Sequence, residues 1–186
     1  MSSFSPLEDQ IRECFGRVVY THKTHEKMAE GCAGTLQSYK IAQIAVSAVT
    51  AFSALSSIFS NAVALRIGTV ALSAVSIWLT GYLKGIDPGG TAQKHRDAAA
   101  SLWSIRESYL SLLTDLRVNS IDKEEAIRRR EQLQTKLDAI YKGAPQTNSA
   151  AYGLAQVALK QNDEYTFSDA EIDKFVPASL RKGKGC

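Results

Sequence analysis

The chain has 186 residues, of which 45% are hydrophobic, and a formal net charge of +3 at pH 7. This charge is mild, and no basic stripe is interleaved with aromatic residues, which argues against nucleic acid as a partner. Cys14, Cys32 and Cys186 show no CxxC or Cys/His spacing, so we expect reduced thiols facing a cytosol. Charge is unevenly distributed, because Arg66 is the only charged residue from 41 to 83.

The N-terminal region 1–38 is predicted to form an amphipathic cytosolic helix. Ser5-Pro6-Leu7-Glu8 combines a capping residue, a proline at the first helical position and a glutamate three residues after the cap. Apolar residues then recur at helical spacing, with most charges on the other face. We expect this helix to loosen at Gly31 and Gly34. Its apolar face consists of Phe4, Leu7, Ile11, Cys14, Phe15, Val18 and Met28.

The apolar block that follows is long enough to cross a membrane twice, because each crossing needs about 20 helical residues. Division at Ser60-Asn61 predicts a transmembrane hairpin over 39–84, with spans of about 39–59 and 63–83. In a soluble protein both helices would need burial on all sides, and the other segments look too short to provide it. Lysines and arginines flank the hairpin ends, whereas Arg66 lies near the turn. The positive-inside rule therefore predicts a multi-pass membrane protein with both termini in the cytosol.

The region 91–186 is predicted to be a cytosolic helical region, since no stretch alternates as a strand. Its first helix carries an apolar stripe that includes Ala92, His95 and Leu102. The predicted fold class is all-α, with a transmembrane hairpin and a cytosolic unit of antiparallel helices that includes the N-terminal helix. The expected helices begin at Thr91, Asp122, Thr147–Ser149 and Ser168, and the first three end near Asn119, Lys142-Gly143-Ala144-Pro145 and Lys160.

No motif in the sequence supports an enzyme, a cofactor or a metal site. Lys94-His95-Arg96-Asp97 is similar to a kinase catalytic loop, but Leu102 stands where that signature needs an asparagine. The glycines of 85–91 are not followed by Lys-Ser/Thr, as a phosphate loop requires. His22-Lys23-Thr24-His25-Glu26 lacks the His-Glu-x-x-His order and a third ligand, so we interpret it as a solvated polar face. We therefore expect a protein without catalytic activity.

Two interpretations are open for Arg128, Arg129 and Arg130 on the predicted helix that begins at Asp122. Three consecutive guanidinium groups are suited to contact with anionic lipid headgroups or a nucleotide phosphate. Acidic residues at helical spacing, such as Glu125, instead favour an ordinary solvated helix face.

Polar residues recur at spacings of three and four along one face of each predicted span. Such a face either packs the two spans together, as small hydroxylated residues commonly do, or lines water. Arg66 favours water, and because two helices cannot enclose an aqueous path, a pore requires a homo-oligomer. The residues are Gln43, Ser47, Thr50 and Ser57 in the first span, and Arg66, Thr69, Ser73, Ser76 and Thr80 in the second.

The arrangement resembles the SLATT family, a two-span membrane effector domain found beside second-messenger nucleotidyltransferases and other prokaryotic conflict systems. The resemblance rests on the hairpin, on KHRDAAASLWSIRESYLSLLTDL at 94–116 and on AIYKGAPQTNSAAYGLAQVAL at 139–159. It implies an oligomeric pore in the lipid bilayer that disrupts the membrane in antiphage defence or cell suicide. The implied trigger is a nucleotide second messenger or a nucleotidyltransferase-linked partner. The alternative is a membrane-anchored helical scaffold without pore activity.

Overall fold

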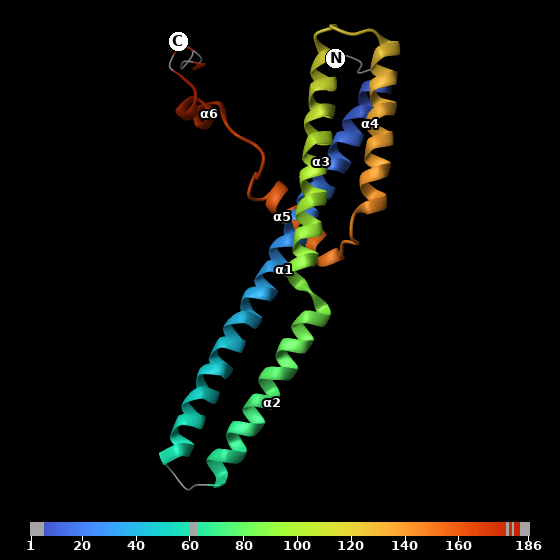
Figure 1. Ribbon diagram of the computed structural model, residues 1–186. Coiled ribbons are helices and arrows are strands. Elements are labelled where there is room, and N and C mark those ends of the chain that lie inside the picture. Colours follow the sequence, from blue (N-terminus) through green and yellow to red (C-terminus); the bar gives the residue numbers. More distant parts are fainter. Residues whose placement is uncertain (1–5, 60–62, 178, 180, 183–186) are drawn as a thin grey trace.

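The computed structural model describes residues 6–59, 63–177, 179 and 181–182. The secondary-structure elements of these residues are α-helices (Figure 1). The predicted all-α class, with two long apolar helices and further helices after them, is confirmed. The predicted cap Ser5, Phe4, the hairpin division at Ser60-Asn61 and Cys186 lie outside the described residues. The helices are α1 (Pro6–Phe59), α2 (Val63–Ile86), α3 (Pro88–Arg117), α4 (Lys123–Gly143), α5 (Ser149–Lys160) and α6 (Asp169–Phe175).

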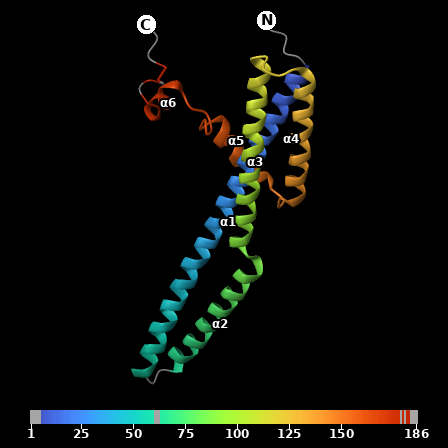
Figure 2. The ribbon, with the colours of Figure 1, turned by 45° about the horizontal axis from the view of Figure 1, so that its top comes forward.

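The chain forms a helical head and a projecting hairpin, which lie at opposite ends of the molecule (Figures 1 and 2). The head consists of residues 6–38 of α1 with α3, α4 and α5. The hairpin consists of residues 39–59 of α1 with α2. In the head, α1 packs against α3 and α5, while α4 packs on α3. Figure 1 shows α6 beyond α5, at the end of an irregular connection.

Helix α1 is uninterrupted for 54 residues, so the predicted loosening at Gly31 and Gly34 is wrong. A glycine inside a helix costs about 1 kcal/mol relative to alanine, which a helix packed against neighbours along much of its length tolerates. A Cβ atom at either position would meet nothing within 4 Å, so neither glycine is needed for close packing. At 1.5 Å per residue α1 is about 80 Å long, and it connects the head rigidly to the hairpin.

Asp87 is the only residue between α2 and α3, and it caps α3. It adopts a left-handed backbone with φ 36°, and its carboxylate accepts a hydrogen bond from the Gly90 N–H at 3.0 Å. A Cβ atom at Gly90 would lie 2.1 Å from the Asp87 carboxylate, so this close cap requires glycine. The predicted cap Thr91 is therefore wrong, since Thr91 lies inside the helix. The second connection between hairpin and head is consequently almost continuous helix as well.

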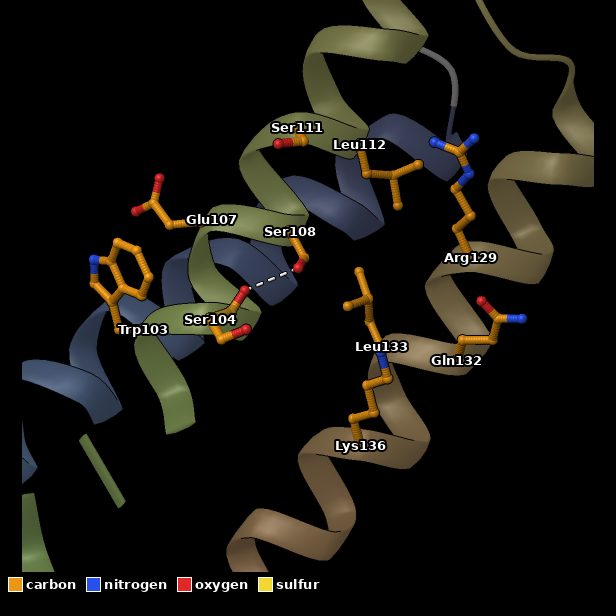
Figure 3. Close-up of a pocket in the computed structure, with 10 residues that line it drawn as sticks. All are labelled: Trp103, Ser104, Glu107, Ser108, Ser111, Leu112, Arg129, Gln132, Leu133 and Lys136. Carbon is orange, nitrogen blue, oxygen red and sulfur yellow. Dashed lines mark hydrogen bonds between the residues drawn. The ribbon is translucent and has the colours of Figure 1, made fainter. Parts of the chain in front are cut away.

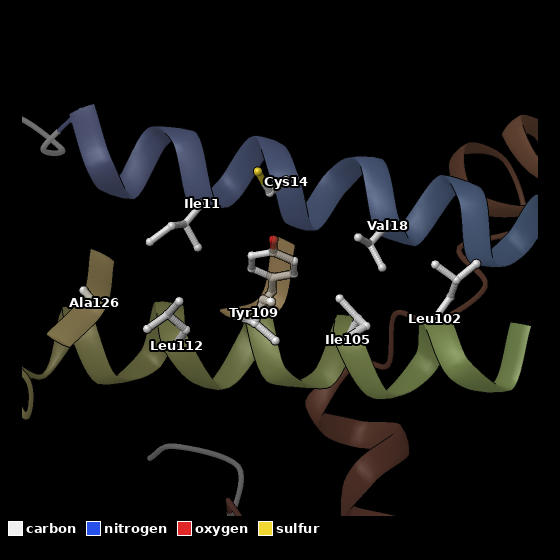
Figure 4. Close-up of a cluster of buried hydrophobic side chains, with 9 residues drawn as sticks. Ile11, Cys14, Val18, Leu102, Ile105, Tyr109, Leu112 and Ala126 are labelled. Carbon is white, nitrogen blue, oxygen red and sulfur yellow. The ribbon is translucent and has the colours of Figure 1, made fainter. Parts of the chain in front are cut away.

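The core of the head is formed where α1, α3 and α4 meet (Figure 4). The predicted apolar stripes of α1 and α3 supply most of it, because one face of each helix repeats at helical spacing. Tyr109 is fully buried, and burial, with the neighbouring Cys14 thiol, raises the pKa of Tyr109 to about 12. The cluster of buried residues consists of Ile11, Cys14, Val18, Leu102, Ile105, Tyr109, Leu112, Ala126 and Leu133.

The hairpin presents apolar side chains outward. The described residues contain two helices that are long and apolar enough to cross a membrane, and the most apolar window of each buries none of its residues. Phe52 is 77% exposed and Ile77 is 74% exposed. A soluble core helix of this composition would be buried on all sides, so the exposed apolar surface favours lipid as its surroundings.

Candidate functional site

Side-chain hydrogen bonds join the helices of the hairpin directly. The Gln43 amide donates to the Thr80 hydroxyl at 2.9 Å, and the Ser53 and Thr69 hydroxyls lie 2.6 Å apart. Ser53 was missed by the sequence analysis, although it lies three residues after Thr50 and belongs to the same helical stripe. These polar residues therefore help to hold the two helices together.

Most hydroxyls of the predicted polar faces also bond to the backbone of their own helix. Such bonds satisfy the hydroxyl without water, as a membrane requires. Thr50, Ser57, Thr69, Ser73 and Thr80 donate in this way to the carbonyls of Val46, Ala54, Leu65, Thr69 and Ser76, at 2.7 to 2.9 Å.

The remaining predicted residues differ in exposure. Ser76 is partly buried beside the helix contact, whereas Ser47 and Arg66 are exposed on the hairpin surface. The structure thus brings Gln43, Thr69 and Thr80 into direct contact between the helices. It leaves Ser47 and Arg66 free to meet lipid, water or another copy.

Arg128, Arg129 and Arg130 lie near the start of α4, at the end of the head away from the hairpin (Figure 1). Each guanidinium already has partners within the head. Arg128 and Arg129 both bind Glu125, and Arg129 also binds Asp115 at 2.8 Å. Arg130 donates to the Gln10 amide oxygen at 2.6 Å. All three arginines therefore make contacts within the head.

Arg129 also lines a shallow cavity of about 400 Å³ between α3 and α4 (Figure 3). Figure 3 shows Arg129, Gln132 and Lys136 along the α4 side and serines along the α3 side, with Leu112 and Leu133 between them. Because Arg129 is held by two carboxylates, Lys136 is the more available cation here.

A second candidate region is a cluster of charged and aromatic side chains inside the head. Lys23 is only 5% exposed, and its ammonium pairs with Glu26 at 2.8 Å and with Glu164 from the segment after α5. A buried charge of this kind is tolerated only when its partners are present. We call this group the polar cluster, and its members are His22, Lys23, Glu26, Arg106, Glu164 and Tyr165.

The ring of Tyr165 lies at the centre of the polar cluster. It stacks on His22 with 5.4 Å between ring centroids and 8° between ring planes. The Lys23 ammonium and the Arg106 guanidinium each lie 4.6 Å from the Tyr165 ring centroid, as in cation–π contacts. The Tyr165 hydroxyl donates a hydrogen bond to Glu26.

The backbone around Tyr165 is strained. Tyr165 has φ 75°, in the left-handed region that bulky residues avoid, and nearby Asp163 has φ 50°, which aspartate tolerates better. Such a conformation costs about 1–3 kcal/mol and persists only when surrounding contacts hold it. The contacts of Glu164 and Tyr165 with α1 provide that constraint.

The protonation states of the polar cluster follow from its contacts. Burial lowers the pKa of His22, although the nearby Glu26 opposes this. Burial would lower the pKa of Lys23, but hydrogen bonds to Glu164 and Glu26 outweigh it and raise that pKa. Burial would likewise raise the pKa of Glu26, but its hydrogen bonds to Lys23 and Tyr165 lower it. At neutral pH the cluster therefore holds a neutral His22 beside a charged Lys23 and Glu26.

His25 of α1 and His95 of α3 form a separate buried contact, with their Nδ1 atoms 2.9 Å apart. One Nδ1 must donate and the other accept, so the contact holds a single proton. Burial, with the neighbouring His95 and His22, lowers the pKa of His25 to about 4, and burial also lowers the pKa of His95.

The interpretation of residues 22–26 as a solvated polar face is therefore wrong. His22, Lys23, Thr24 and His25 are all buried, because α3 and the segment after α5 cover this part of α1. Four consecutive buried residues occupy all sides of a helix, so neighbours must surround α1 here. The sequence contained one indication of this burial. His95 falls on the predicted apolar stripe of α3, and a buried histidine needs a polar partner on a neighbouring helix. Among the described residues no group of three or more His, Cys, Asp or Glu side chains could hold a metal ion.

The hairpin and the head together define a membrane protein of two apolar helices joined to a helical bundle. The chain belongs to the SMODS and SLOG-associating 2TM effector domain family 4, a SLATT family, whose sequence model matches residues 7–171. The predicted resemblance is thus confirmed, and the protein is a membrane effector of the kind found in conflict systems associated with SMODS nucleotidyltransferases. No curated protein and no solved structure matches the chain.

Proposed function

We propose that several copies of this effector assemble in the membrane and form a pore through one side of the hairpin. Each residue advances by about 100° around a helix, and the two helices run antiparallel. Ser47 of α1 and Arg66, Ser73 and Thr80 of α2 consequently fall on the same side of the helix contact. We call these four residues the polar side. The hydrogen bond from Gln43 to Thr80 supports this arrangement, because it requires both residues to lie on one side.

The polar side carries the proposal because it is a poor surface for lipid. The opposite side presents Val75 and Trp78, which are 47% and 64% exposed and suited to hydrocarbon. On the polar side, Ser47 and Arg66 are exposed, and an arginine within a membrane helix favours water or a polar partner. In an assembly that turns the polar sides inward, the polar side would meet water and the side with Val75 and Trp78 would meet lipid.

The proposed orientation follows from the charges that flank the hairpin. Lys40 and Lys84 lie at the head end of the two helices, and Arg66 lies near the turn. By the positive-inside rule the head, with both chain termini, faces the cytosol of a cell whose inner membrane the hairpin crosses. We also infer a non-catalytic role, in antiphage defence or cell suicide, that a nucleotidyltransferase-linked signal or partner triggers.

The head is suited to control the hairpin because both connections between them are helical. α1 is continuous from the head to the turn, and Asp87 alone separates α2 from α3. A change in how α1 and α3 pack would therefore move both helices of the hairpin. A signal can shift this equilibrium only if it binds the two arrangements with different affinity.

Dye leakage from liposomes that contain the purified protein tests the pore. Ser47→Leu with Ser73→Leu should strongly reduce leakage, because it replaces two of the four residues of the polar side with leucine. Ser56→Leu is the matched control, since Ser56 is exposed on the opposite side of α1, and it should leave leakage unchanged.

Equal leakage from the double variant and the wild type would refute the assignment of the polar side to a pore. Absence of leakage from every form, including the wild type at high protein density, would favour a membrane-anchored helical scaffold instead.

A further inference from the structure

Tyr165 forms one wall of a cavity of about 610 Å³ between α1 and α3. Volumes of about 300–1,000 Å³ are typical of small-molecule sites. Ala99 and Ala100 leave space on the α3 side, while Trp103 is 52% exposed and offers an aromatic face. The cavity thus combines small and aromatic walls with charged groups. The remaining lining residues are His22, Glu26, Arg96 and Arg106.

Tyr165 itself is held as a bound aromatic ligand would be. Its ring is stacked on His22 and lies beneath the Arg106 guanidinium, and its hydroxyl donates to Glu26. Yet its backbone at φ 75° is strained, so the ring keeps this position only through these contacts. A competing ring that made the same contacts would release the strain.

We propose that this cavity binds a small ligand in which a planar, amino-bearing ring is joined to an anionic group, and that Tyr165 occupies the place of the ring until the ligand displaces it.

The ring chemistry follows from the groups that Tyr165 contacts. A ring that replaces Tyr165 must be planar to stack on His22 and must form a cation–π contact with the Arg106 guanidinium. It must also donate a hydrogen bond to Glu26. Tyrosine donates this hydrogen bond through its hydroxyl, and an aminated heteroaromatic ring would donate it through an N–H group.

The anionic group follows from the charge balance of the cavity. Glu26 is paired with Lys23, and Arg106 is paired with Glu107 at 2.7 Å. Arg96 lines the cavity, is exposed, and has no ion pair within the described ranges. A phosphate is a suitable partner for this guanidinium. A nucleoside phosphate combines both features.

Binding would also unlock the segment after α5. Glu164 and Tyr165 are adjacent, so displacement of the ring pulls on the ion pair between Glu164 and Lys23. This consequence for the membrane rests on the proposed function, whereas binding itself does not.

Fluorescence of Trp103 tests the site in the full chain purified in detergent. Trp78→Phe leaves Trp103 as the only tryptophan, and the probes are AMP, adenosine and inorganic phosphate in separate titrations. AMP should change the fluorescence saturably, and either fragment should bind at least about tenfold more weakly, because each makes only part of the contacts.

Variants then separate the ring site from the anion site. Tyr165→Ala should lower the apparent Kd for AMP by about tenfold, because the site is no longer occupied by its own side chain. Tyr165→Phe keeps the ring but loses the bond to Glu26, and should shift the Kd in the same direction by a smaller factor. Arg96→Ala should raise the Kd by about tenfold. Lys94→Ala, two residues away and lining a different cavity, should have no effect.

The proposal is overturned if AMP causes no saturable change in either the wild type or Tyr165→Ala. It is also overturned if Tyr165→Ala binds AMP no more tightly than the wild type, or if Arg96→Ala and Lys94→Ala behave alike. The titration does not depend on membrane leakage. A negative titration therefore does not contradict the pore proposal, and a negative leakage assay does not contradict the proposed ligand site.

Discussion

The Nδ1 atoms of His25 and His95 lie 2.9 Å apart and join α1 to α3 inside the head. Both side chains are at most 2% exposed. A second proton at this contact would create a buried imidazolium, point two N–H groups at each other and remove the acceptor of the hydrogen bond. The contact between the two helices that lead to the hairpin is therefore stable only while the pair keeps a single shared proton.

Acid should destabilise the head. The pKa of His25 is about 4 in the folded chain, against an ordinary value of 6.5. Between these values the unfolded chain binds a proton that the folded head excludes. The free energy of unfolding should therefore fall as the pH drops from 6.5 towards 4, by up to about 3 kcal/mol for His25, and stay constant above that window. Thermal unfolding followed by circular dichroism in detergent, from about pH 7.5 to about pH 5, measures this.

A variant separates this effect from the titration of carboxylates, which stay ionised in most of that range. His25→Gln should flatten the pH dependence, with His22 and His95 supplying what remains. Gln37→Ala changes an exposed position on the same helix and should keep the full slope. An unaltered slope in His25→Gln would contradict the assignment.

Loss of the Lys23 ammonium should destabilise the head strongly. Lys23→Met leaves Glu26 and Glu164 facing each other without their shared cation, at an expected cost of about 3–5 kcal/mol. Lys27→Met removes the more exposed pair with Glu30 and should cost less than about 1 kcal/mol. Chemical denaturation in detergent compares the two variants.

Adding Glu164→Gln to Lys23→Met should recover part of the loss, because it removes one of the unpaired charges. If Lys23→Met cost no more than Lys27→Met, the polar cluster would contribute nothing to the stability of the head.

The hydrogen bond between Ser53 and Thr69 should couple the helices of the hairpin. A double-mutant cycle with Ser53→Ala and Thr69→Val should show a coupling of about 0.6 to 1.7 kcal/mol. Reversible unfolding in mixed detergent and SDS micelles provides the measurement. Ser56→Ala serves as the control in a second cycle with Thr69→Val, and its effect should be additive because Ser56 lies on the exposed surface.

Truncation of Leu102 should test the packing of α1 against α3. Leu102 is fully buried, so Leu102→Ala should cost about 2–5 kcal/mol through lost burial and the cavity left behind. Leu110, on the same helix, is 46% exposed, and Leu110→Ala should change the stability by less than about 1 kcal/mol. Similar losses in both variants would mean that the two helices do not pack as described.

Local signals predicted the ends of several helices correctly. Asp122 accepts a hydrogen bond from the Glu125 N–H at 2.7 Å, and Ser168 forms a capping box with Glu171. Such caps depend only on residues three positions apart, so a sequence reveals them. The Asp87 cap was equally local, since aspartate is a preferred capping residue and Pro88 follows it at the first helical position, but Thr91 was predicted as the cap instead.

The apolar block 41–83 determined the hairpin by itself, since its length and lack of charge match two crossings of a hydrocarbon core. The same periodicity determined which residues of α1 and α3 enter the core of the head. Only the tertiary structure decided that residues 22–26 are buried, because Tyr165 reaches them from more than a hundred positions along the chain. It also decided which hydroxyls join the hairpin helices, because their pairing depends on how two antiparallel helices rotate against each other. Composition and spacing describe one helix at a time, and contacts between helices depend on the packing of them all.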